Sequence, residues 1–366
     1  MKIALVHDYI REYGGAERVL RVLADMYPRA PIYTAFRIKE STCDRQFTDR
    51  CIKESKLSFI LKIWNLYSPL RFLTPVVWGG FDLSGYDVVI ASSSWYITRG
   101  FKTGPKTKVV CYCHTPPRWL YGYETSVGFT KYKLVKAYAV VVGHFMRIYD
   151  FKSSRKVNRW IANSENVRKR IKKFYRVNSR VIHPPVEVKR IKKATKNLKK
   201  ENYFLIVSRL VGAKGIKEPI LAFKDLGYEL KIVGESHGFS KVNESLRKTS
   251  GDNVSFLGRV NDSDLYELYG KAKGFIALAR DEDFGMTVVE AQAAGTPVIA
   301  FNGGGFKESV IDGVTGILIN DTDKKTIDKA VKKLCAKRWN KAVLMGNVER
   351  FSRENFERKI KDVVKD

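Results

Sequence analysis

Short apolar runs recur along the chain between longer segments with helical periodicity. Runs of this length, rich in Val and Ile and bounded by Gly, Pro or Ser, are typical of buried parallel strands. Five lie in the first half, at residues 3–6, 88–91, 108–113, 160–162 and 181–182. Five lie in the second half, at residues 203–207, 229–233, 254–257, 274–278 and 297–300. Strands that alternate with helices predict an α/β protein with helices on both faces of its sheets.

The series of strands restarts near residue 201, after two prolines and a dense basic run that has no apolar period. Such a run indicates a linker. We therefore expect a first domain at 1–182, a basic linker at 183–200 and a second domain at 201–340, with a helix at 341–366 that packs back on either domain. In doubly wound sheets, ligands bind beyond the carboxyl ends of the strands. The corresponding edges of the two domains can therefore face each other across a cleft.

Composition narrows the possible partners. The 366 residues are 44% hydrophobic, which excludes global disorder, and 67 Lys and Arg against 38 Asp and Glu give a formal net charge of +29. This charge indicates an anionic partner, such as nucleic acid, an acidic membrane or a phosphorylated substrate. The five cysteines are too scattered for a disulfide framework, so we expect reduced thiols. Without a signal peptide or a run of ~18–20 apolar residues, the protein is expected in the cytoplasm.

Two loops in the first half could carry chemistry. Gly14 and Gly15 precede an apolar periodic helix, where glycine lets the backbone approach a ligand and the helix amides can meet an anion. A simple turn is the alternative. His114 ends the strand at 108–113 and precedes two prolines, which suits a cleft residue, although a structural histidine is equally compatible. Cys111 and Cys113 lack a second Cys/His cluster to complete a tetrahedral metal site, so we expect buried thiols.

The loop after the strand at 203–207 contains two cations around a glycine-containing turn, Arg209 and Lys214. Two cations where a strand leads into a helix can hold a diphosphate. In a chain this basic, a pair of cations also arises by chance. The position after the strand, rather than the charge, therefore favours the diphosphate.

The loop after the strand at 274–278 gives the strongest signal. Glu282 lies in this loop, Phe284 and Gly285 end it, and Glu290 lies inside the following helix. A loop carboxylate accepts hydrogen bonds from hydroxyl groups and the first amides of a helix donate them, which together suit a sugar. For Glu290, stabilisation by the helix dipole is the alternative. The Asp-x-Asp pairs at 281–283 and 262–264 are too common to indicate a metal.

Taken together, segments 14–19, 113–119, 163–171, 208–215, 256–260 and 282–310 resemble a family of retaining glycosyltransferases. This family, glycosyltransferase group 1, contains sucrose-phosphate synthases and bacterial lipid mannosyltransferases. The resemblance implies the GT-B fold, in which two Rossmann-like, doubly wound parallel-sheet domains face each other across a cleft. It also implies that the first domain binds the acceptor and the second binds the nucleotide sugar. Segments 113–119 and 288–300 are most similar to polysaccharide mannosyltransferases.

The same resemblance implies roles for individual residues. The four expected to act in catalysis are Glu282, His114, Arg209 and Lys214. Arg209 and Lys214 would neutralise the donor diphosphate, Glu282 would contact the donor sugar, and His114 would lie near the sugar and the acceptor. The further donor-binding residues are Gly14, Gly15, Arg259, Val260, Phe284, Gly285, Met286 and Glu290. Asp283 departs from the family's usual glycine, and its side chain can point away from the sugar.

The implied reaction moves a hexose, with mannose favoured, from a donor such as GDP-mannose to a lipid-linked or membrane-associated glycan, with retention of configuration. We expect no metal and no cofactor beyond this substrate. The alternatives are a glucosyl- or N-acetylglucosaminyltransferase of the same fold, and a non-catalytic basic GT-B scaffold that binds anionic partners. A nucleic-acid-binding protein would have the same charge, but no such motif is present, so nucleic acid is not expected as a partner.

The excess of positive charge is concentrated in particular segments. Residues 168–200 contain fourteen Lys and Arg against one acid, and segments 57–78 and 131–159 mix cations with aromatic and aliphatic residues. Such mixtures suit an anionic bilayer, at about 1 kcal/mol per basic residue near the surface. We therefore expect a peripheral protein on the inner face of the membrane. A solvated basic surface that only aids solubility is the alternative.

Overall fold

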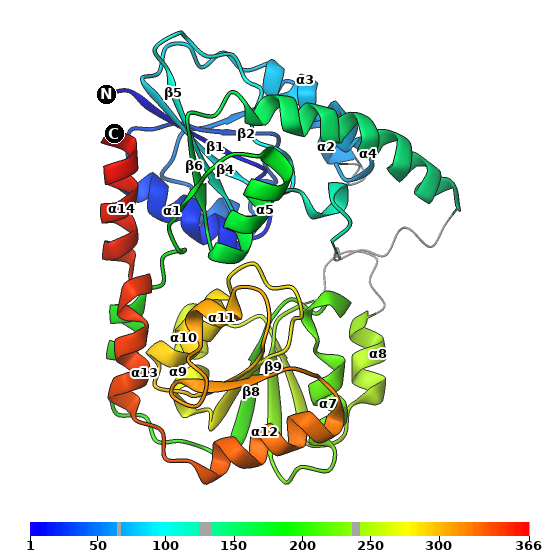
Figure 1. Ribbon diagram of the computed structural model, residues 1–366, viewed down its shortest axis with the longest axis vertical. Coiled ribbons are helices and arrows are strands. Elements are labelled where there is room, and N and C mark those ends of the chain that lie inside the picture. The colour runs from blue at the N-terminus through cyan, green and yellow to red at the C-terminus, as the bar shows by residue number, and fades with distance from the viewer. Residues whose placement is uncertain (64–66, 124–132, 236–241, 366) are drawn as a thin grey trace. The chain divides into compact units, whose positions relative to one another are not determined.

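The computed structural model describes residues 1–63, 67–123, 133–235 and 242–365 (Figure 1). The chain divides into two compact units. Among the described residues, unit 1 comprises 1–63, 67–123, 133–185 and 356–365, and unit 2 comprises 186–235 and 242–355. Each unit is built on one parallel sheet with its own apolar core.

The sheet of unit 1 has the strand order β3-β2-β1-β4-β5-β6-β7, and its neighbouring strands all pair in parallel. The strands are β1 Ile3–His7, β2 Ile32–Thr34, β3 Ile52–Glu54, β4 Val88–Ser93, β5 Lys108–Cys113, β6 Arg159–Ala162 and β7 Arg180–Val181. The chain winds outward in one direction from β1 and then in the other from β4. The point between β1 and β4 is therefore the topological switch point, beside which ligands bind in such sheets.

The helices of unit 1 begin where the sequence provides caps. The amide of Val167 donates to Ser164 Oγ at the start of α5, and the backbone amide of Gly14 donates to Glu17 Oε2 at the start of α1. The helices are α1 Gly15–Met26, α2 Ser58–Lys62, α3 Thr74–Gly79, α4 Lys133–Ser154 and α5 Glu165–Tyr175, with short turns η1 Asp44–Gln46, η3 Pro69–Leu73 and η4 Arg118–Leu120. The last helix, α14 Arg353–Lys365, also belongs to this unit from residue 356 onward.

The sheet of unit 2 has the order β10-β9-β8-β11-β12-β13, again with parallel pairs only. Its strands are β8 Tyr203–Val207, β9 Glu229–Val233, β10 Val254–Gly258, β11 Gly274–Ala277, β12 Val298–Phe301 and β13 Gly316–Ile319. Its helices are α6 Val188–Ala194, α7 Lys217–Phe223, α8 Val242–Thr249, α9 Asp262–Lys271, α10 Met286–Ala293, α11 Phe306–Ser309, α12 Lys324–Ala336 and α13 Lys341–Asn347, with turns η6 Gly212–Lys214 and η7 Glu349–Phe351. The switch point of this sheet lies between β8 and β11.

The doubly wound fold class predicted from sequence is confirmed in both units. The ten predicted strands are all present, and none of their ends moves by more than two residues. Three further strands, β2, β3 and β13, were not predicted. The segment 183–200, expected as a linker, contains α6, whose Val188 and Ile191 are buried in the core of unit 2. The C-terminal helix α14 packs into the core of unit 1 through Phe356 and Ile360.

Candidate active site

The switch point of unit 2 brings together the loops that the sequence singled out. Strands β8 and β11 are neighbours in the sheet, so the loops that follow them begin side by side. The first loop carries Arg209 and Lys214, and the second carries Glu282. This is the edge where a doubly wound sheet binds its ligand.

Lys214 and Glu282 form an ion pair across these two loops. The distance from Lys214 Nζ to Glu282 Oε2 is 2.6 Å, although the residues are 68 positions apart in sequence. Their side chains are 24% and 18% exposed, so a ligand in solution can reach both charges. Arg209 is exposed at the start of the first loop. The pair, which we call the switch-point pair, offers a cation for a phosphate and a carboxylate for hydroxyl groups.

The turn around Glu282 is held by glycines that follow β12. The amide of Gly305 donates to the carbonyl oxygen of Glu282 at 2.9 Å. A Cβ atom at Gly304, where φ is +54°, would lie 2.3 Å from that same oxygen. Only glycine therefore fits against this turn. The sequence analysis gave these glycines no role, although three consecutive glycines directly after a strand are a signal of close backbone approach.

Helix α10 begins beside the same carboxylate. Its N-cap, Gly285, has φ +88°, and the ideal Cβ position there lies 3.5 Å from Cγ of Glu282. The buried ring of Phe284 contacts Phe351, with 5.3 Å between ring centroids, which anchors the end of the loop. First-turn amides of a helix have no acceptor within the helix. The backbone from Phe284 to Met286 therefore places donors next to Glu282.

Glu290 and the loop after β10 lie apart from the switch-point pair. Glu290 is buried inside α10, where its Oε2 accepts a hydrogen bond from Tyr269 at 2.8 Å. Arg259 is exposed and Val260 packs on the core, beyond β10. In the sheet, β9 and β8 separate β10 from β11. Among the contacts of the described residues, none joins Arg259 or Val260 to Lys214 or Glu282.

The switch point of unit 1 carries a hydrogen-bonded chain of four side chains, which we call the histidine relay. His7 Nε2 lies 3.4 Å from Glu17 Oε1, and His7 Nδ1 lies 3.0 Å from Ser92 Oγ. Ser92 Oγ then lies 2.8 Å from His114 Nε2. His7 and Ser92 are direct partners in the β1–β4 register, and His114 follows the next strand, β5.

The relay begins at an ionised carboxylate. Although burial raises the pKa of Glu17, hydrogen bonds from His7 and from the Gly14 amide outweigh it and lower the pKa overall. An ionised Glu17 only accepts, so His7 Nε2 donates to it. Ser92 Oγ, with one proton to donate and lone pairs that accept, bridges His7 Nδ1 and His114 Nε2.

His114 is only 8% exposed, and its environment disfavours the charged form. Burial, together with repulsion from His7, lowers the pKa of His114 to about 3. His114 is therefore neutral at physiological pH, so one of its ring nitrogens donates a hydrogen bond and the other accepts one.

The buried carboxylate of Asp8 connects two loops at the same edge of the sheet of unit 1. Asp8 accepts hydrogen bonds from the backbone amide of Trp95 at 2.6 Å and from the hydroxyl group of Ser94 at 2.7 Å. Burial raises the pKa of Asp8 despite these bonds. The contacts connect the loop after β1 to the loop after β4. Asp8, His7, Ser92 and Glu17 were not predicted as site residues. The signal that marks His7, Asp8 and Ser92 is their position at or near the ends of strands, whereas Glu17 lies in α1.

The possible metal ligands are dispersed. Within the described ranges, no group of three or more His, Cys, Asp or Glu side chains could hold a metal ion. Cys111 and Cys113 are fully buried thiols, as predicted, and burial raises the pKa of Cys111 to about 11. In the part of the chain that the structure describes, no helix has the length and apolar character needed to cross a bilayer.

Two family models match the chain and together extend over most of it. The model for glycosyl transferases group 1 matches residues 187–351, and the model for Glycosyltransferase Family 4 matches residues 13–190. Each half of the chain therefore matches a glycosyltransferase family model. The first model includes the whole switch-point pair, and the second includes the histidine relay from Glu17 onward.

Curated relatives align with part of the chain. It is 29% identical over 153 residues to an uncharacterized glycosyltransferase of Methanocaldococcus jannaschii, covering 42% of the chain and 44% of the relative. It is 34% identical over 135 residues to the capsular polysaccharide biosynthesis glycosyltransferase CapM of Staphylococcus aureus, covering 35% of each. The chain thus spans less than half the length of these relatives.

Solved structures align over the full length. The Anabaena protein HepE in complex with UDP and glucose has a TM-score of 0.71 at 18% identity, covering 100% of this chain and 99% of that one. Sucrose-phosphate synthase of Thermosynechococcus elongatus has a TM-score of 0.70 at 17% identity, covering 100% and 98%. These similarities confirm the GT-B fold class of the two parallel-sheet domains.

Proposed function

We propose that the protein is a retaining glycosyltransferase that moves a hexose from a nucleoside-diphosphate sugar to a lipid-linked or membrane-associated glycan. The observation that carries this proposal is the switch-point pair, which places a reachable cation and carboxylate at the ligand-binding edge of unit 2. Mannose, and hence GDP-mannose, is favoured because segments 113–119 and 288–300 resemble polysaccharide mannosyltransferases. The name of the S. aureus relative supports a role in polysaccharide synthesis.

The donor would exchange contacts with the switch-point pair. Its diphosphate would take the place of Glu282 as the partner of Lys214, and Arg209 would add a second cation from the same loop. Glu282 would then accept hydrogen bonds from the hexose hydroxyl groups, and the backbone amides of Phe284, Gly285 and Met286 would donate to others. Fixed positive charge at the leaving diphosphate stabilises the transition state as the glycosidic C–O bond breaks.

The acceptor would attack from the face that the leaving group vacates. Its hydroxyl oxygen bonds to the anomeric carbon, the bond from that carbon to the diphosphate breaks, and the hydroxyl proton passes to a phosphate oxygen. His114 is neutral, so it would orient a hydroxyl group by a hydrogen bond rather than supply a proton. Glu290 and the loop at Arg259 and Val260 would contact the nucleoside.

Donor binding is the first test. We expect one of GDP-mannose, UDP-glucose and UDP-N-acetylglucosamine to raise the melting temperature, because a ligand at 100 times its Kd stabilises the fold by about 2.7 kcal/mol. The shift should be lost in Lys214→Met and kept in Lys224→Met, which removes an exposed cation elsewhere in unit 2. UDP-glucose is a serious alternative donor, given that the HepE structures contain UDP and glucose.

Product analysis is the second test. NMR of the product should show the anomeric configuration of the donor, and a chelator should leave the rate unchanged. An inverted anomer would exclude the front-face route, and loss of activity with the chelator would exclude metal-independent transfer. Donor binding without transfer or hydrolysis would favour a non-catalytic scaffold instead.

A further inference from the structure

Exposed apolar side chains are concentrated on one part of unit 1. Fifteen large hydrophobic residues are exposed among those described, and nine of them belong to residues 58–79 or to α4. The nine are Phe59, Ile63, Phe72, Val76, Tyr138, Val140, Val141, Phe145 and Ile148. Monomeric soluble proteins rarely gather this much apolar surface in one place without a partner.

The two segments form one continuous surface, which we call the α2–α4 face. The hydroxyl group of Tyr138 in α4 donates to the carbonyl oxygen of Pro69 in the turn η3. Figure 1 draws α4 in the same part of unit 1 as α2 and α3. Residues 136–141 are exposed at every position, and Phe145 is 66% exposed, whereas Met146 and Asp150 further along α4 are buried. An apolar stretch of helix exposed on all sides is stable only when something other than water covers it.

Charge on this face has one sign. No Asp or Glu lies between Glu54 and Asp82, and the carboxylate in α4, Asp150, is fully buried against Arg99. The exposed cations on or beside the face are Lys56, Lys136, Arg147, Lys152, Arg155 and Lys156. The surface is therefore both apolar and cationic, with no exposed acid in these two segments.

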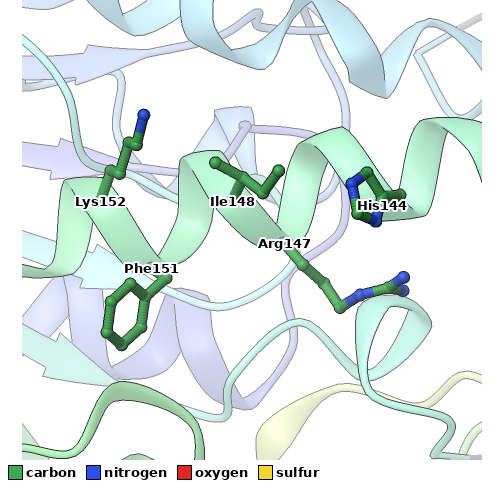
Figure 2. A pocket seen from close by; sticks show the side chains of 5 residues that line it. All are labelled: His144, Arg147, Ile148, Phe151 and Lys152. Atoms are coloured by element: carbon green, nitrogen blue, oxygen red, sulfur yellow. The ribbon is translucent and has the colours of Figure 1, made fainter.

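The second half of α4 carries apolar and cationic side chains next to each other. A hollow of about 320 Å³ is lined by His144, Arg147, Ile148, Phe151 and Lys152. Figure 2 shows the charged ends of Arg147 and Lys152 extending away from the helix, with Ile148 between them along its length. Long cationic side chains keep their charge in water while their stems lie along apolar material.

We propose that the α2–α4 face docks unit 1 on an anionic lipid bilayer, with its apolar side chains in the interface and its cations among the headgroups. The features fit a bilayer better than a protein or a nucleic acid. Eight of the nine apolar residues lie on exposed surface outside the hollow, and a nucleic acid backbone would give them no partner. Of the sequence segments 57–78 and 131–159, residues 64–66 and 131–132 lie outside the described residues. The proposal does not depend on the sugar donor.

Vesicle sedimentation with the full chain tests this proposal. We expect binding to phosphatidylcholine vesicles that contain phosphatidylglycerol, weaker binding at high salt, and little binding to phosphatidylcholine alone. Val141→Ser with Phe145→Ser should weaken binding at least about tenfold. Ile311→Ser with Val314→Ser, which removes two exposed apolar side chains from unit 2, should leave it unchanged.

A second pair of variants separates charge from apolar contact. Lys136→Gln with Lys152→Gln should weaken binding to the anionic vesicles, by about fivefold per cation removed. Lys325→Gln with Lys329→Gln in α12 of unit 2 changes the net charge equally and should have little effect. Nucleotide-sugar thermal shifts on every variant report whether the fold and the donor site are intact, whichever donor is bound.

Three results would overturn the proposal. The first is equal binding to neutral and anionic vesicles, and the second is binding that the apolar variants do not change. The third is a wild-type dimer that Val141→Ser with Phe145→Ser converts to a monomer, because the face would then be an interface between two copies of the chain.

Discussion

Two of the ion pairs that join residues far apart in sequence differ in burial. In unit 1, Arg99 and Asp150 are 1% and 0% exposed, and the hydroxyl groups of Tyr121 and Tyr175 also donate to the Asp150 carboxylate. In unit 2, Lys214 and Glu282 are 24% and 18% exposed. The first pair is closed to solvent, and the second is open to it.

This difference in burial separates a structural pair from a functional one. A closed pair cannot exchange its partner for a ligand, and removing one member leaves the other charge buried and uncompensated. An open pair adds little to stability, because water solvates both charges when it breaks. Lys214 and Glu282 can therefore exchange their contact for a ligand at small cost, whereas Arg99 and Asp150 hold β4, α4 and their neighbours in place.

Removing the carboxylate of the buried pair of Arg99 and Asp150 should have the largest effect on stability. Asp150→Ala should lower the free energy of unfolding by about 3–5 kcal/mol, because Arg99 stays buried without its carboxylate. Urea unfolding followed by circular dichroism measures this change. The control is Lys332→Ala, which breaks the exposed pair with Asp328 on α12 and should change stability by no more than about 1 kcal/mol. A similar loss in both variants would show that burial does not distinguish the pairs.

Breaking the open pair should instead affect turnover. Lys214→Ala and Glu282→Ala should each lower kcat about 10²–10³-fold, because each removes a charge aimed at the donor, while stability changes by less than about 1 kcal/mol. Initial rates with the preferred nucleotide sugar and urea unfolding together test both parts. Lys224→Ala serves as the control and should keep the wild-type rate.

A variant with both substitutions tests whether Lys214 and Glu282 act together in turnover. Residues in direct contact are not expected to act additively, so Lys214→Ala with Glu282→Ala should cost less than the product of the two single effects. If either single variant keeps nearly the wild-type rate, its assigned role is wrong. If either unfolds, the pair belongs with Arg99 and Asp150 as a structural contact.

The sequence predicted the long central strands better than the short outer ones. Apolar runs such as 203–207 are buried on both faces, so their composition alone marks them. Strands β2 and β3 have three residues each, and β3 is only partly buried. Runs this short carry little periodicity, so the sequence predicted 160–162 and 181–182 but missed β2 and β3, whose pairing depends on the neighbouring strand. The basic residues of α6 likewise concealed a buried face formed by Val188 and Ile191.

Contacts between residues on different strands of the two candidate sites could not be predicted from the sequence either. Arg209, Lys214 and Glu282 could be proposed because charged residues directly after strands suggest ligand contacts. That Lys214 touches Glu282 could not, since it depends on β8 and β11 being neighbours. The partners of His114 were hidden for the same reason. His7 and Ser92 are single residues on different strands, and only the register of the sheet brings them together.

The smallest of the expected effects concerns the charge state of the relay in unit 1. The pKa of His114 is lowered by burial from its ordinary 6.5 to about 3, so the unfolded chain binds this proton at a higher pH than the folded chain. The resulting stability is fully present above pH 6.5 and is lost as the pH falls toward 3.

Wild type should therefore lose about 2 kcal/mol more than His114→Gln between pH 6.5 and pH 5, since each pKa unit corresponds to about 1.4 kcal/mol. Urea unfolding at the two pH values measures this difference. NMR of the histidine ring nitrogens should show His114 neutral at pH 5. Parallel pH dependence in the two proteins would mean that His114 is accessible enough to be protonated. Unit 1 would then offer a titrating histidine at its switch point, and the contrast with the openly charged edge of unit 2 would disappear.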